Sequence, residues 1–477
     1  MNSTFKNLIW YTIPFLFRNL IPLISLPFFT RYLSPFDFGN LALSVIYAVF
    51  LVALLNLGLI YVFERNYFEY EKDGEKLKLL WSCVIFVFIN LGIGVIVTIN
   101  YEEQINYYLF SKSLPTHLTV FATIHLGVKS LLQFFYIYLR NAKKAFIYSL
   151  LSIFEALICT LSSVYLVFYK KGILGYVQGQ CVGVFVLFVA IILFSIFRRN
   201  IYFSFLLLKQ NLSLSFPLTP RVFFGAINTQ FDRYMLGVLN TRGGVGIYDI
   251  GQKIANFGFL SMTVMQHVFA PEVISTYVNK PKDFSKHVGQ YLAPFFYVST
   301  FICLLLGLFS KEIVFLLTTP EYYEAYQIII ILNMLYATYF FGKQPQLILA
   351  KKTKLISILS FVSIILNIVV NYPLIKIYGI VGAALGTLFA GMIMAIISLY
   401  YAQKFAKIEY NKSVYFIYAL FQISMLLILY LSTFQVFSYI SFLVVKLCII
   451  ILFILLGFKL KIIDKKFIKT IKLRRDV

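Results

Sequence analysis

The sequence predicts an all-α polytopic membrane protein with about 14 transmembrane helices. Of its 477 residues 60% are hydrophobic and only 13% are charged, and the mean hydropathy is +0.85, which is more apolar side chain than a soluble core can bury. The apolar residues form segments of membrane length separated by short gaps, and Lys and Arg collect in every second gap. This alternation predicts orientation as well as fold.

The first half of the chain contains six predicted helices, at 7–29, 39–63, 79–100, 118–139, 146–169 and 173–197. The first is too long for the apolar part of a signal peptide and has no small-residue cleavage site, so we expect it to be retained. Basic residues follow every second helix: Lys72, Lys76 and Lys78; Arg140, Lys143 and Lys144; and Arg198 and Arg199.

The second half repeats this pattern, with predicted helices at 217–239, 245–277, 291–317, 326–350, 355–378, 381–403, 414–431 and 437–458. With an N-terminus in the cytoplasm, the cytoplasmic side holds about 28 Lys or Arg and the other side about 7. Both termini are therefore predicted to be cytoplasmic. The gaps are too short for an independently folded domain.

The net charge of +23 is explained by this topology and by anionic lipid head groups, so we expect membrane lipids as partners and no nucleic acid. Residues 461–475 alternate basic and apolar side chains. They are predicted either to lie on the inner leaflet as an amphipathic helix or to act only as a topological stop.

A short motif occurs twice in the same orientation. Residues 31–41 and 240–248 each place an Arg in a turn before a helix that opens with an apolar residue and Gly. Such a parallel repeat occurs in some transporters. It predicts two six-helix lobes related by a pseudo-twofold repeat, at 1–205 and 206–405, followed by a helix pair and basic tail at 406–477.

The sequence contains no nucleophile elbow, phosphate loop or zinc-spaced histidine pair, and its four histidines lie far apart. Its five cysteines fall inside apolar segments without paired spacing, which disfavours a disulfide framework or a metal site. Glu102 and Glu103 are predicted to form a solvated rim. We therefore expect neither an enzyme nor a cofactor.

Charges within the predicted helices are the candidates for function, because an ionised side chain near the bilayer centre costs at least about 2.5–3.5 kcal/mol. Arg18 lies about 16 Å from either end of its helix, too deep to reach an interface. Lys129 is equally central, and either faces a cavity or pairs with Glu155.

Five further charged positions are interpreted by depth and spacing. Asp249 and Lys253 are four residues apart, so they either pair with each other or serve the cavity. Arg221 and Lys343 are predicted to reach the inner interface. For Lys446 we expect a partner protein or a lipid phosphate.

Three prolines, Pro14, Pro22 and Pro27, lie in the first predicted helix. Each removes a backbone hydrogen bond and permits a bend. A bending helix that carries Arg18 would suit a gate, although membrane helices also tolerate proline without such a role.

A series of short motifs resembles the polysaccharide-exporter family of lipid-linked oligosaccharide flippases, within the multidrug/oligosaccharidyl-lipid/polysaccharide exporter superfamily. The motifs are RNLIP at 18–22, FFTRYLSP at 28–35, DRYMLG at 232–237, VGIY at 245–248 and YGIVGAA at 378–384. Many members have Ile-Pro shortly before this Tyr-Gly pair, whereas this chain has Ile375 and Lys376, with its proline at Pro373. That departure affects a predicted loop.

The resemblance implies two lobes around a cavity and alternating access. The implied cargo is a polyprenyl-pyrophosphate-linked oligosaccharide repeat unit, moved from the cytoplasmic to the outer leaflet of a bacterial inner membrane for O-antigen or capsule synthesis. A polysaccharide polymerase and glycosyltransferases would then be partners. Arg18, Lys129 and Lys253 are the predicted pyrophosphate ligands.

Several alternatives stay open. Glu155 or Asp249 would couple transport to protons or sodium, unless the membrane potential alone drives it. A multidrug or cation antiporter is the second interpretation, and a membrane polysaccharide polymerase is a third.

Overall fold

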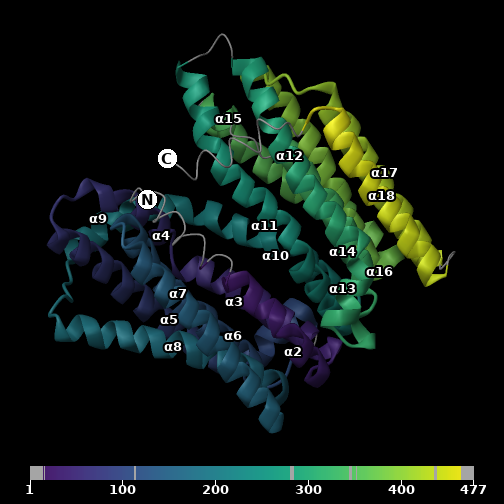
Figure 1. Cartoon of the computed structure of the whole chain (residues 1–477). Coiled ribbons are helices and arrows are strands. Elements are labelled where there is room, and N and C mark those ends of the chain that lie inside the picture. Colours follow the sequence, from purple (N-terminus) through teal and green to yellow (C-terminus); the bar gives the residue numbers. More distant parts are fainter. Residues whose placement is uncertain are drawn as a thin grey trace. The chain divides into compact units, whose positions relative to one another are not determined.

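A computed structural model describes residues 14, 17–111, 114–279, 284–342, 346–350, 352–434 and 438–462 (Figure 1). All regular elements within these ranges are helical. Each predicted membrane span corresponds to one or more of the helices, so the predicted all-helical fold is confirmed. The chain is a multi-pass membrane protein.

The chain divides into two compact units, one comprising Met1–Gly246 and Leu317–Thr319, the other Ile247–Leu316 and Pro320–Val477. The predicted lobe boundaries at 205 and 405 stay a prediction. After a helical stretch at 17–24, the first unit contains α2 (Leu26–Tyr32), α3 (Pro35–Leu55), α4 (Leu59–Asn66), α5 (Asp73–Phe110), α6 (Leu118–Asn141), α7 (Ala145–Leu166), α8 (Gly172–Phe197), α9 (Phe205–Ser215) and α10 (Thr219–Leu239).

Helix α11 (Arg242–Asn279) begins in the first unit and continues into the second. The second unit also contains α12 (Phe284–Leu308), α13 (Ser310–Leu317), α14 (Ala325–Gly342), α15 (Gln346–Leu349), α16 (Thr353–Phe405), α17 (Lys412–Phe434) and α18 (Tyr439–Lys459). Helices α17 and α18 lie side by side (Figure 1).

Nine segments of the described chain are long and apolar enough to cross a membrane. Two of these, at 145–197 and 354–405, have 53 and 52 residues and so correspond to two predicted passes each. In α16 the passes join at Gly379, whose φ of 55° lies in the left-handed region. Helices α10 and α11 fall outside the nine because polar and charged residues interrupt their apolar faces.

The predicted helix at 39–63 begins earlier and breaks before its end. Ser34 caps α3 by accepting the backbone N–H of Asp37, whose carboxylate accepts the backbone N–H of Ser34 in return. The chain then turns at Gly58, with φ of 71°, before α4 begins. Helix α9, which the sequence did not predict, packs against α4 and α5.

The two copies of the repeated motif meet within the first unit. Gly39 of α3 lies against the backbone carbonyl of Arg242, and Gly246 lies against that of Pro35, so a side chain at either glycine would overlap the opposing backbone. The Arg242 guanidinium also donates to Asn40 Oδ1 at 3.3 Å. The motif glycines therefore allow α3 and the start of α11 to cross closely.

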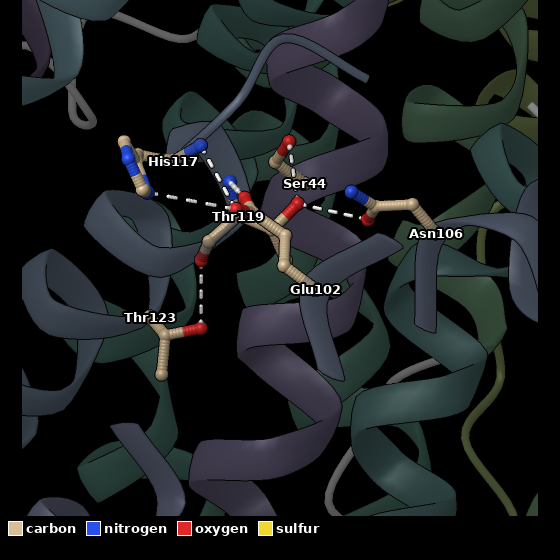
Figure 2. Close-up of polar contacts among 6 residues, drawn as sticks. All are labelled: Ser44, Glu102, Asn106, His117, Thr119 and Thr123. Atoms are coloured by element: carbon tan, nitrogen blue, oxygen red, sulfur yellow. Dashed lines mark hydrogen bonds and ion pairs between the residues drawn. The ribbon is translucent and has the colours of Figure 1, made fainter. Parts of the chain in front are cut away.

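A buried carboxylate joins α5 to α6 (Figure 2). Glu102 accepts the backbone N–H of His117 at 2.9 Å and that of Thr119 at 3.1 Å, at the N-terminus of α6. The Thr119 hydroxyl donates to Asn106 Oδ1 at 2.9 Å. The predicted solvated rim is therefore wrong for Glu102, which caps a helix, whereas Glu103 is exposed.

All five cysteines lie in the described residues and are free thiols. Four of them are buried between packed helices, and only the side chain of Cys448, in α18, is exposed. Their placement in apolar segments thus reflects helix packing in four cases out of five.

Candidate functional site

An ion-pair cluster forms around α6 in the first unit. The carboxylate of Glu155, on α7, accepts a hydrogen bond from Arg18 Nη2 at 3.2 Å and another from the Tyr136 hydroxyl. Lys129 Nζ lies 4.0 Å from the second carboxylate oxygen, which makes an ion pair without a hydrogen bond. The Arg18 guanidinium also lies over the Tyr136 ring, 5.6 Å from its centroid.

Burial is unequal within this cluster. The side chain of Glu155 is 4% exposed, whereas those of Arg18 and Lys129 are 36% and 41% exposed. The carboxylate is therefore part of the helix packing, and both cations are partly exposed. Since two cations meet one carboxylate, the cluster carries one excess positive charge when all three are ionised.

Lys129 also lines a cavity of about 750 Å³ within the first unit. The cavity is bounded by residues of α3, α4, α6 and α10 together with the segments that precede α4 and α10. Most of its surface is apolar, and its polar lining residues are Asn56, Tyr61, Lys129, Ser130, Gln133, Arg221 and Thr229. Among the residues that the structure describes, the lining thus contains two cations, Lys129 and Arg221, and no carboxylate.

Arg221 is a cavity residue that the sequence did not indicate. Its position near the start of a predicted helix predicts that it reaches the inner interface, and this stays a prediction; the structure adds that Arg221 lines the cavity. Depth along a helix could not show this, because depth does not give direction around the helix axis. A helical projection of α10 would have aligned Arg221 with Gly225 and Thr229, which share the cavity face.

The second unit holds a similar pair on α11. Lys253 Nζ lies 2.7 Å from Asp249 Oδ2, as their four-residue spacing predicted. The Asp249 side chain is 8% exposed and that of Lys253 is 43% exposed. As at Glu155, the carboxylate is buried and the cation is partly exposed.

A sequence model of a family described as "Polysaccharide biosynthesis protein" matches residues 4–275, more than half of the chain. The chain belongs to this polysaccharide biosynthesis protein family. No curated protein gives a significant match.

Solved structures similar to this family member are membrane transporters. The lipid II flippase MurJ in an inward closed conformation superposes with a TM-score of 0.70 and 19% identity, over 93% of this chain and 98% of that one. An inward-facing multidrug resistance MATE family transporter of the MOP superfamily gives 0.58 and 13%, over 83% and 97%. An outward-facing conformation of a MATE family transporter gives 0.57 and 14%, over 83% and 93%. These likenesses establish the fold.

The first helix of this family member is kinked at Ser25, which keeps a right-handed helical conformation and whose backbone N–H still donates to the carbonyl oxygen of Ile21. Residues 17–24 are helical, Ser25 forms a turn, and Pro27 lies in the first turn of α2. The Ser25 hydroxyl donates to the carbonyl oxygen of Pro22 at 3.0 Å. Pro22 and Pro27 thus flank the kink at Ser25, while Pro14 is a buried helical residue before it.

Lys446 has an internal partner instead of the predicted external one. Its ammonium, which is 0% exposed, donates to both oxygens of Glu312 at 2.6 and 2.8 Å. The pair joins α18 to α13 within the second unit. Lys343 and residues 463–475 of the predicted tail lie outside the described residues.

Proposed function

We propose that this protein is a flippase for polyprenyl-pyrophosphate-linked oligosaccharide repeat units. It moves them from the cytoplasmic to the outer leaflet of a bacterial inner membrane by alternating access, for O-antigen or capsule synthesis. The observation that supports the proposal is that Lys129 and Arg221 line a cavity whose surface is mostly apolar.

The chemistry of this cargo matches the cavity. Phosphates and sugar hydroxyls are too costly to transfer through hydrocarbon without compensating partners. Cations supply charge-assisted hydrogen bonds to phosphate, and the planar guanidinium does so with two donors at once. Neutral side chains such as Asn56, Gln133 and Thr229 offer donors and acceptors for sugar hydroxyls.

We assign pyrophosphate binding to Arg18, Lys129 and Lys253, and add Arg221 on the basis of the cavity. The polyprenyl chain stays in the lipid. The kink at Ser25, between Pro22 and Pro27, allows the helical segment that carries Arg18 to bend, and we assign this segment to the gate.

The driving force follows from the cargo's charge. An inside-negative potential favours outward movement of an anion by about 2.3 kcal/mol per charge per 100 mV. The alternative is exchange of protons or sodium at Glu155 or Asp249. Clamping the potential to zero at constant ion gradients separates these, because transport that continues unchanged would require the ion exchange.

Cationic drugs are a poorer match for this cavity. A cation antiporter needs carboxylates or aromatic faces toward its substrate, whereas the carboxylates of both pairs are buried and the exposed charges are positive. A polymerase would need an acid, base or metal group beside its substrate. The cavity lining offers cations and neutral polar groups.

The test is translocation of a labelled polyprenyl-pyrophosphate oligosaccharide in proteoliposomes. We compare the intact protein with Arg18→Ala, Lys129→Ala and Arg221→Ala. The control is Arg140→Ala, which removes an exposed cation that pairs with Glu64 away from the cavity.

Loss of a hydrogen bond to a charged group costs about 1.5–3 kcal/mol, so transport by each of the Arg18, Lys129 and Arg221 variants should fall roughly tenfold to a hundredfold. Transport by Arg140→Ala should stay at the intact level. Equal transport by all four variants would discard the site. No transport by intact protein with several glycans would discard the flippase.

A further inference from the structure

The ion pairs of the candidate site share an order of burial that a structural pair in the same protein reverses. At Glu155 and at Asp249 the carboxylate is buried, with 4% and 8% of the side chain exposed, and its cations are 36–43% exposed. In the Lys446–Glu312 pair the cation is 0% exposed and the carboxylate 28%. The cations are therefore the more accessible members of these pairs, and their carboxylates are the buried ones.

We propose that Glu155 and Asp249 are internal competitors of the substrate. In the empty protein each carboxylate holds the cations that a phosphate takes over when the substrate binds. This inference rests on the proposed function, since it concerns the same cations and a pyrophosphate cargo.

The geometry at Glu155 allows such an exchange. Arg18 is held by one hydrogen bond, at 3.2 Å, and by its contact with the Tyr136 ring, and Lys129 by an ion pair at 4.0 Å that is too long for a hydrogen bond. Both side chains are partly exposed, so a rotamer change is enough to release the carboxylate. The carboxylate then keeps its hydrogen bond from the Tyr136 hydroxyl, so it is not left without a partner.

Competition of this kind serves turnover. Two half-exposed cations with no nearby carboxylate would bind a pyrophosphate tightly and release it slowly. A buried carboxylate to which the cations can return helps to displace the phosphate on the releasing side. It also reduces the positive charge that the empty protein carries back through the membrane field.

The experiment measures binding of inorganic pyrophosphate to the purified full-length protein in phosphatidylcholine nanodiscs by calorimetry. The variant is Glu155→Gln, whose amide oxygen still accepts from Tyr136 but no longer attracts Arg18 and Lys129. Pyrophosphate should bind about five- to tenfold more tightly than to the intact protein. In proteoliposomes the half-saturating substrate concentration and the maximal rate should both fall, since release slows.

The matched control is Glu64→Gln, which removes a carboxylate from the exposed pair with Arg140. It should leave both pyrophosphate affinity and transport unchanged. A second variant, Glu155→Asp, keeps the charge but withdraws it by one methylene, and should tighten binding less than the amide does. It gives the answer on its own where the amide variant fails to fold.

The outcomes separate the two proposals. If the intact protein binds and transports, and a folded Glu155→Gln or Glu155→Asp variant binds pyrophosphate no more tightly, the competition is wrong and the flippase stands. If the intact protein neither binds pyrophosphate nor transports the glycolipid, the proposed function fails and the inference with it.

Discussion

Replacing Glu312 by Ala should destabilise the second unit severely. The change leaves the Lys446 ammonium, which has no exposed surface, without the two carboxylate oxygens at 2.6 and 2.8 Å that accept its hydrogen bonds. Breaking a buried pair by removing one partner costs about 3–5 kcal/mol. Because the rings of Phe442 and Phe309 lie 4.4 and 5.5 Å from the ammonium and remain, we expect the lower end, about 3 kcal/mol.

The reverse change, Lys446→Met, should cost less. Glu312 is 28% exposed and lines a cavity of about 930 Å³, so its carboxylate can be hydrated once the lysine is gone. Methionine refills the apolar volume of the lysine stem, and we expect a loss of about 1 kcal/mol. The double variant should then be close to Lys446→Met, because neither buried charge is left unpaired.

Thermal unfolding of the purified protein in detergent measures the cycle. At roughly 2–4 °C per kcal/mol, Glu312→Ala should lower the Tm by about 6–12 °C, and adding Lys446→Met should restore most of that difference. Equal and additive effects of the two single changes would refute the reasoning, since they would mean that the ammonium finds water or another partner when its carboxylate is removed.

Two further predictions concern helix contacts in the first unit, and both use the same unfolding assay. Gly246→Ala places a methyl group against the carbonyl of Pro35 and should lower the free energy of unfolding by about 1–3 kcal/mol. In the control, Gly243→Ala, the nearest contact is a Pro35 side-chain atom at 3.9 Å, so the stability should not change. Similar Tm values for both variants would contradict the close crossing. In Glu102→Gln the side chain can accept only one of the two N–H groups at the start of α6, so the free energy of unfolding should fall by about 1–2 kcal/mol. The control, Glu103→Gln, changes an exposed side chain and should have no effect. An unchanged Tm for Glu102→Gln would argue against the cap.

Helix existence could be predicted because membrane length and apolar composition are properties of the sequence alone. Helix continuity could not, since it depends on single backbone conformations. Gly58 adopts a positive φ and splits one predicted helix, whereas Gly379, also at positive φ, forms the kink at which the two predicted helices at 355–378 and 381–403 join in α16. Both positions are glycines in the sequence, but composition alone does not tell which glycine takes a positive φ.

The candidate site was predictable where the free-energy cost of a charged side chain depends on its depth in the membrane. Arg18 and Lys129 stood out because charge in mid-membrane is costly. The hydrogen bond from Arg18 to Glu155 joins residues 137 positions apart and has no sequence signal. Arg221 was missed because its face of α10, not its depth, brings it to the cavity.

The burial of four cysteines makes this protein convenient for thiol chemistry. With Cys448→Ala, a water-soluble maleimide would find no accessible native sulfur among the five, because the other four lie between packed helices. A single cysteine introduced at Ser130 or Thr229 would then report, by its labelling rate, when water reaches the cavity. Comparing that rate with and without substrate would show when the cavity opens and closes, because the native thiols of the chain would not react.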